Sequence, residues 1–226
     1  MKKTLFKAFI AFCLGILFHQ EVFSQVSQAV TDPFTMLKEG NERFVAGKSI
    51  RPNQDFERLK QVSEGQKPFA IIVGCSDSRV PSEIIFDQGL GDLFIVRTAG
   101  QVSSYASWAS IEFAHAVLGS KLIVVLGHTS CGAVAAACKV PDVPGHIVTL
   151  INAIKPAAEE AHKHAGDLIE NTVKINVAMQ VEQLKKLEPV LTKALKSGQL
   201  KVIGAVYDLQ TGRVEFLPED YLQTLK

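Results

Sequence analysis

Four short apolar runs, all rich in β-branched residues, limit most strongly how this chain can fold. Each run is continuous rather than alternating, which is typical of strands that are covered on both faces of a sheet. Helical segments separate them, and the joins around the first three are short. A strand–helix–strand order with short joins favours right-handed crossovers and a parallel sheet. The four runs are FAIIVG (69–74), DLFIVR (92–97), LIVVLG (122–127) and KVIGAVYD (201–208).

The segments around these runs supply the expected helices. Before the first run, DPFTMLKEGNERFVAG and the shorter DFERLKQVSEG predict two helices, which together form an N-terminal helical arm over residues 33–65. Between the runs, helices are expected in PSEIIFD, SYASWASIEFAHAVLG and SCGAVAAACK, and a longer helical region over 148–196. The segment TGRVEFLP predicts a last edge strand. We therefore expect an α/β fold with a mainly parallel β-sheet flanked by helices.

The first 24 residues have the layout of a secretory signal peptide. Three lysines precede an apolar run of about 11 residues, which is shorter than the roughly 20 that a membrane span needs. The small Ser24 then offers a cleavage site next to Gln25. An uncleaved N-terminal anchor is the alternative. We expect an exported, periplasmic protein in which residues 25–226 form a single domain, since 226 residues suit one core rather than two.

Charge and cysteine content exclude several classes of function. Cleavage would remove three lysines and one glutamate, so the formal net charge would fall from +1 to −1. A nearly neutral chain without a basic block has no long-range attraction to nucleic acid or anionic lipid. We expect no nucleic-acid partner, and no membrane attachment after signal cleavage. Three of the four cysteines would remain, an odd number that does not suit a disulfide scaffold.

Three metal-binding side chains lie where two of the predicted strands end. Cys75 closes the first strand in GCSDSR, and His128 and Cys131 follow the third strand in GHTSCG. The carboxyl ends of parallel strands meet at one edge of a sheet, which is where ligands bind in open α/β folds. A single cysteine there is usually a small packing residue, but two such motifs together favour a metal site. Two thiolates and an imidazole suit Zn²⁺ and leave a fourth position open, so we expect one catalytic zinc ion per chain.

If the chain stays extended after Cys75, the side chains of Asp77 and Arg79 point to the same side as that of Cys75. Asp77 could be the fourth zinc ligand, which would close the site. Alternatively, Arg79 could hold Asp77, which would then accept a hydrogen bond from a zinc-bound hydroxide. These roles exclude each other, so Arg79 could act as a switch between them. An ordinary surface ion pair, worth under about 1 kcal/mol, is the structural alternative.

The motifs CSDSR and GHTSCG together resemble those of the β-class carbonic anhydrases, zinc enzymes that interconvert carbon dioxide and bicarbonate. The resemblance covers roughly residues 34–217, through EGNERFVAG, GDLFIVRTAG, SIEFAHAVLG and GAVYDLQTGRVEF, although Thr98 stands where the family often has Asn. It implies that Cys75, His128 and Cys131 bind zinc. It also implies that Asp77, paired with Arg79, orients the attacking hydroxide or closes the site as a fourth ligand.

The same resemblance implies carbon dioxide and bicarbonate as small-molecule partners, and a homodimer or larger homo-oligomer whose N-terminal arm reaches over the neighbouring subunit. Two alternative functions would use the same three ligands: hydrolysis of carbonyl sulfide or carbon disulfide, and a non-catalytic zinc- or bicarbonate-binding module.

Thiol redox chemistry is disfavoured because the sequence has no C-x-x-C motif. Cys131 and Cys138 would lie about 10 Å apart along a helix, too far for a disulfide, so we expect Cys138 to be a buried thiol.

Overall fold

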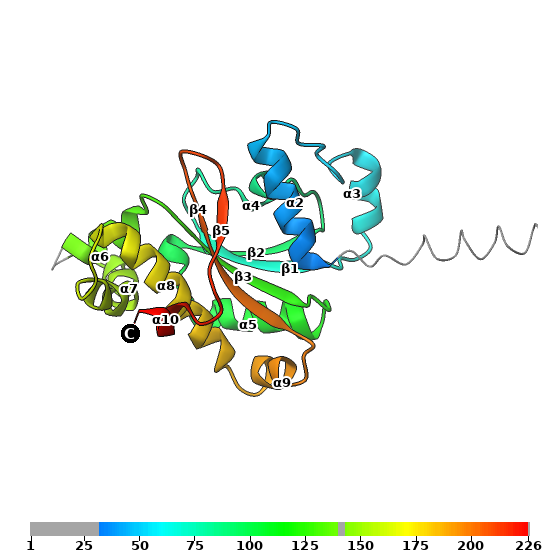
Figure 1. Ribbon diagram of the computed structural model, residues 1–226. Helices are drawn as coiled ribbons and strands as arrows, with labels where there is room; N and C mark the ends of the chain where they lie inside the picture. The colour runs from blue at the N-terminus through cyan, green and yellow to red at the C-terminus, as the bar shows by residue number, and fades with distance from the viewer. Residues whose placement is uncertain (1–31, 140–142, 226) are drawn as a thin grey trace, which may run out of the picture. The chain divides into compact units, whose positions relative to one another are not determined.

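The computed structural model describes residues 32–139 and 143–225 (Figure 1). The chain from Pro33 onward forms one compact unit. The predicted signal peptide and its cleavage site lie outside the described residues. Within the described part of the chain, no helix is both long enough and apolar enough to cross a membrane.

All four predicted strands form, and they line up in one sheet with a fifth. The central strands run parallel, as predicted, and only the last pairs antiparallel with its neighbour. The spatial order is β2-β1-β3-β4-β5, so the first and third strands are neighbours at the centre of the sheet. The strands are β1 (Ala70–Cys75), β2 (Leu93–Thr98), β3 (Leu122–His128), β4 (Lys201–Tyr207) and β5 (Val214–Phe216).

The predicted helices form as well, with one difference in the long region expected over 148–196. That region is divided into three helices. Gly166, with φ of 109°, and the N-cap Asp167 separate the first two, and Pro189 begins the third. The helices are α2 (Pro33–Val45), α3 (Phe56–Val62), α4 (Ser82–Ile85), the 3₁₀ turn η1 (Ala99–Gln101), α5 (Tyr105–Ala116), α6 (Gly132–Lys139), α7 (Ile147–Ala161), α8 (Leu168–Lys185), α9 (Val190–Lys196) and the short α10 (Tyr221–Thr224).

Helices cover both faces of the sheet (Figure 1). On one face, Ile71 and Val125 pack in the same cluster as residues of α5 to α9. On the other face, Ile72 and Val124 pack against residues of α2 and α4. Every residue of β1 and β3 is buried, which confirms the prediction for these strands. The prediction is wrong for β2, where only Leu93 is buried, because this strand lies at the edge of the sheet.

The arm helix α2 is attached to the sheet through a buried asparagine. Asn41 donates hydrogen bonds to the carbonyl oxygens of Ile85 (3.1 Å) and Gly212 (2.9 Å), and its Oδ1 accepts one from the Val214 amide. Leu37, on the same helix, is fully buried. These contacts connect α2 with the α4 segment and the β4–β5 hairpin of its own chain.

Candidate metal centre

The three predicted metal-binding side chains meet at the carboxyl edge of the sheet. Cys75 is the last residue of β1, His128 is the last residue of β3, and Cys131 directly precedes α6. All three are buried, and their donor atoms lie within 4.8 Å of one another. The turn between His128 and Cys131 passes through Ser130 at φ of 54°, a backbone conformation that non-glycine residues rarely adopt. Because β1 and β3 are neighbours, their ends bring the two motifs together.

The imidazole of His128 is oriented for binding a metal ion. Its Nδ1–H donates a hydrogen bond to the carbonyl oxygen of Thr129 (2.9 Å), which leaves the lone pair on Nε2. Nε2 is buried and has no hydrogen-bond partner in residues 32–139 and 143–225. A buried polar atom without a partner is costly, and a bound cation would remove that cost. Thr129 itself is fixed by bonds between its amide and the Tyr207 carbonyl and between its Oγ1 and the Leu209 amide.

Contact between the two thiols moves their pKa values in opposite directions. A hydrogen bond from Cys131 lowers the pKa of Cys75; burial opposes this, while backbone amides, including that of Gly100, reinforce it. The bond to Cys75, together with burial, raises the pKa of Cys131. The Gly100 amide lies 3.3 Å from the Cys75 Sγ. A cation that binds both sulfurs as thiolates must displace the proton held by Cys131, whose pKa is raised. Zn–S and Zn–N bonds of about 2.0–2.3 Å fit a donor group of this size.

Asp77 faces Arg79 in a two-pronged ion pair. Arg79 donates from Nη2 to Oδ2 (2.7 Å) and from Nε to Oδ1 (2.9 Å), and its backbone amide also donates to Oδ1. The Arg79 side chain is the main reason why the pKa of Asp77 is well below its usual range. Oδ2 lies 3.8 Å from the unpartnered Nε2 of His128. Arg79 thus pairs with a carboxylate that lies close to the donor group.

Arg97 is a residue of the site that the sequence analysis missed. It lies near the end of β2 and donates from Nε to the Cys75 carbonyl (2.8 Å) and from Nη2 to the Asp77 carbonyl (2.6 Å). The guanidinium thus holds the backbone of the CSDSR loop on either side of Ser76. The signal in the sequence is an arginine that closes an otherwise apolar strand run. This arginine can be assigned to the site only once β2 is known to pair with β1.

Cys138 lies apart from the site. It is partly exposed rather than buried, so that part of the prediction is wrong. It lies near the C-terminal end of α6 and packs against the core, with Sγ 3.4 Å from the Thr172 hydroxyl. Cys75, Cys131 and Cys138 are all free thiols, as expected.

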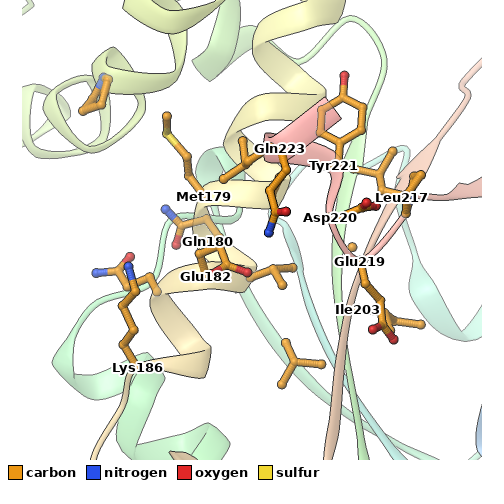
Figure 2. A pocket seen from close by; sticks show the side chains of 18 of the residues that line it. Met179, Gln180, Glu182, Lys186, Ile203, Leu217, Glu219, Asp220, Tyr221 and Gln223 are labelled. Atoms are coloured by element: carbon orange, nitrogen blue, oxygen red, sulfur yellow. The ribbon is translucent and has the colours of Figure 1, made fainter. Parts of the chain in front are cut away.

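A cavity of about 570 Å³ lies elsewhere, between α8, β4 and the C-terminal segment. Figure 2 shows Met179 and Gln180 on one side of this cavity and Tyr221 and Gln223 on another. None of the three donor residues lines it. The candidate site therefore rests on the donor geometry at the sheet edge and not on this cavity.

Comparison with known proteins agrees with this geometry. Residues 70–214 match the family model described as carbonic anhydrase. A carbonic anhydrase of Mycolicibacterium smegmatis is 42% identical over 183 residues, which are 79% of this chain and 89% of the relative. One from Pseudomonas aeruginosa is 37% identical over 173 residues, covering 70% and 77%.

Solved structures give the same result. A tetrameric β-carbonic anhydrase of Sordaria macrospora superposes with a TM-score of 0.66 at 28% identity, covering 79% of this chain and 93% of the other. The Coccomyxa β-carbonic anhydrase, solved in complex with acetazolamide, gives a TM-score of 0.65 at 28% identity, covering 79% and 83%. Together, the sequence matches, the shared fold and the Cys–His–Cys group show that this chain belongs to the β-class carbonic anhydrases.

Proposed function

We propose that this protein catalyses the reversible hydration of carbon dioxide to bicarbonate and a proton, with one zinc ion per chain. The observation that carries the proposal is the buried Cys75–His128–Cys131 group, in which no described residue forms a hydrogen bond with the His128 Nε2. Two soft sulfur donors and an imidazole nitrogen favour zinc over the harder magnesium and calcium ions. A zinc ion held there would act as a Lewis acid that makes water nucleophilic near neutral pH.

In this proposal Asp77 orients the attacking water. Its carboxylate is held by Arg79 on one side and lies near the donor group on the other. Because Arg79 keeps the pKa of Asp77 well below its usual range, the carboxylate stays ionised between pH 6 and pH 9. An ionised carboxylate can only accept hydrogen bonds, so it fixes the direction in which the nucleophile points its proton. It leaves a lone pair of the nucleophile free to meet carbon dioxide.

We expect the rate of carbon dioxide hydration by the zinc-loaded protein to rise from pH 6 to pH 9. Two thiolates offset the charge of the zinc ion, so it acidifies water less than an ion bound by three imidazoles. Asp77 does not contribute to this rise because it is ionised throughout the range. Stopped-flow measurements with a pH indicator test this expectation.

The same experiment separates the alternatives. A pH profile that is flat from 6 to 9 would contradict the mechanism. Absence of turnover at every pH, with one zinc ion per chain, would instead identify a non-catalytic binding module. A higher kcat/KM for carbonyl sulfide or carbon disulfide than for carbon dioxide would assign the site to the sulfur substrates.

Arg97 should position the loop rather than take part in the reaction. Replacing it with glutamine removes charge-assisted hydrogen bonds, each worth about 1.5–3 kcal/mol, so we expect kcat/KM to fall about 10- to 100-fold. The loss should come with a faster release of zinc to a chelator, because the backbone of Cys75 is then less constrained. Arg97→Lys, which keeps a donor, should recover part of both properties. An Arg97→Gln variant with normal activity and normal zinc release would exclude this role.

We also propose that the protein is a homodimer or a larger homo-oligomer. Several large apolar side chains are exposed on the single chain, including Tyr105 (86%), Phe56 (69%) and Val117 (65%). Within the described part of the chain, no strand pairs with the outer edge of β2. The Sordaria macrospora relatives are tetrameric. Light scattering on the purified protein would give the number of subunits.

Export to the periplasm, with cleavage near Ser24–Gln25, is a further proposal. It is supported by the lysines and the apolar run at the start of the sequence. N-terminal sequencing of the mature protein would test it, and an intact N-terminus would favour the uncleaved anchor.

A further inference from the structure

We propose that Asn176 is a positioning residue for the metal centre. It lies on helix α8, far from both metal-binding motifs in the sequence. It holds the Gly100 backbone so that the Gly100 amide points at the sulfur of Cys75. This inference rests on the proposed zinc site. It adds a residue that belongs to neither of the two metal-binding motifs.

The contact chain runs from α8 through η1 to the sulfur. Asn176 is 1% exposed, and its Nδ2 donates a hydrogen bond of 3.0 Å to the Gly100 carbonyl. The amide of the same glycine lies 3.3 Å from the Cys75 Sγ. The two peptide units that flank the Gly100 Cα are therefore each held at one end, one by an α8 side chain and the other by the thiol. A change at Asn176 reaches the sulfur through one residue.

Gly100 has a backbone conformation and a close packing that both favour glycine. Its φ is +66°, a region that favours glycine. A Cβ atom at this position would lie 2.6 Å from the Ile154 Cδ1 and 3.3 Å from the Ala133 Cβ. The glycine is thus packed closely against α6 and α7, and Asn176 hydrogen-bonds to its carbonyl oxygen. The backbone here is fixed by packing and by one hydrogen bond from α8.

The neighbours of Asn176 on α8 have different partners, which makes a comparison possible. Thr172, Asn176 and Gln180 lie four residues apart and form a buried polar stripe on one face of the helix. The Thr172 hydroxyl donates within its own helix to the Leu168 carbonyl. The Gln180 Oε1 accepts a hydrogen bond of 3.2 Å from the Ser103 amide. Within this stripe, Asn176 alone contacts the residue whose amide reaches the sulfur.

A hydrogen bond to a thiolate ligand draws electron density from the sulfur and fixes its direction. Partners in the outer shell of a metal site typically change metal affinity or activity by about 10- to 100-fold when they are lost. Loss of the Asn176 amide should let the Gly100 peptide rotate away from Cys75. Zinc should then bind more weakly, while the three ligands themselves remain.

The test compares Asn176→Leu with Gln180→Met in the full chain. Each substitution replaces a buried amide with an apolar side chain of similar size, and each leaves one backbone group without its partner. We expect Asn176→Leu to weaken zinc binding about 10- to 100-fold in competition with a chromophoric chelator. Gln180→Met should stay within about threefold of the unchanged protein. Both variants should lower the melting temperature of the metal-free protein, because both lose a buried hydrogen bond.

A spectroscopic signature separates positioning from simple destabilisation. In the cobalt-substituted protein, loss of the N–H···S bond makes the sulfur a stronger electron donor. The sulfur-to-cobalt charge-transfer band should therefore move to longer wavelength in Asn176→Leu and stay in place in Gln180→Met. Asn176→Ala leaves room for a water molecule at the Gly100 carbonyl. It offers a milder form of the same measurement if the leucine variant does not fold.

Equal zinc affinities and equal band positions in the Asn176 and Gln180 variants would overturn the proposal and leave Asn176 a purely structural role. Failure of the proposed function would look different. The unchanged protein would then bind zinc without hydrating carbon dioxide, and the affinities and spectra would still decide the role of Asn176.

Discussion

Replacing Cys131 with serine should abolish stable zinc binding and lower kcat/KM for carbon dioxide hydration by at least about a thousandfold. The physical reason is the loss of one of only three donors in the group formed with Cys75 and His128. A serine hydroxyl is a much poorer ligand for zinc than a thiolate. The ion would then be held only by the thiolate of Cys75 and the imidazole of His128. Metal analysis after gel filtration, together with stopped-flow kinetics, measures both effects.

Cys138→Ser is the matched control for this substitution. It makes the same chemical change seven residues further along the chain, at the other end of α6. The Cys138 Sγ contacts the Thr172 hydroxyl, and Cys138 does not belong to the donor group. We therefore expect one zinc ion per chain and activity within about twofold of the unchanged protein, since Cys138 is only partly buried and serine is close to cysteine in size. Zinc retained in Cys131→Ser, or lost in Cys138→Ser, would show that the donor group is assigned wrongly.

The sequence was sufficient to predict the sheet and the donor group because both depend on local signals. Each central strand is a continuous apolar run, and Cys75 and His128 sit at the ends of two such runs. The prediction needed only that these strands run parallel and lie near each other. In the structure these two strands pair directly with each other, so the two motifs lie side by side.

What the sequence could not provide depends on the order of the strands and on long-range packing. Arg97 contacts the CSDSR loop only because β2 pairs with β1, with Cys75 opposite Thr98 in the register. Asn176 reaches Gly100 only because α8 packs against β3 and β4, far along the chain from the glycine. A polar residue in a helical pattern, read without its neighbours, is indistinguishable from a solvated one. The partial exposure of Cys138 likewise depends on how α6 packs, which periodicity alone does not determine.

Replacing Asp77 with asparagine should lower kcat by about 100- to 1000-fold while the protein keeps one zinc ion per chain. Asparagine keeps the size of the side chain but loses the charge. Its amide can also donate a hydrogen bond where the carboxylate could only accept one. The nucleophile would then lose the acceptor that fixes its orientation, although the Cys–His–Cys group is unchanged. Metal analysis and the pH profile of kcat measure the two parts of this expectation.

Arg79→Gln completes a double-mutant cycle with Asp77→Asn. Arg79 contacts the carboxylate at 2.7 and 2.9 Å but lies on the exposed side of the pair, so it should act through Asp77. The single Arg79 variant should therefore lose less activity than Asp77→Asn. The double variant should lose no more than Asp77→Asn alone, because residues that act as a unit are not additive. Additive losses would mean that Arg79 has an independent role. Loss of zinc in Asp77→Asn would mean that the carboxylate is a ligand, which would establish the closed site instead.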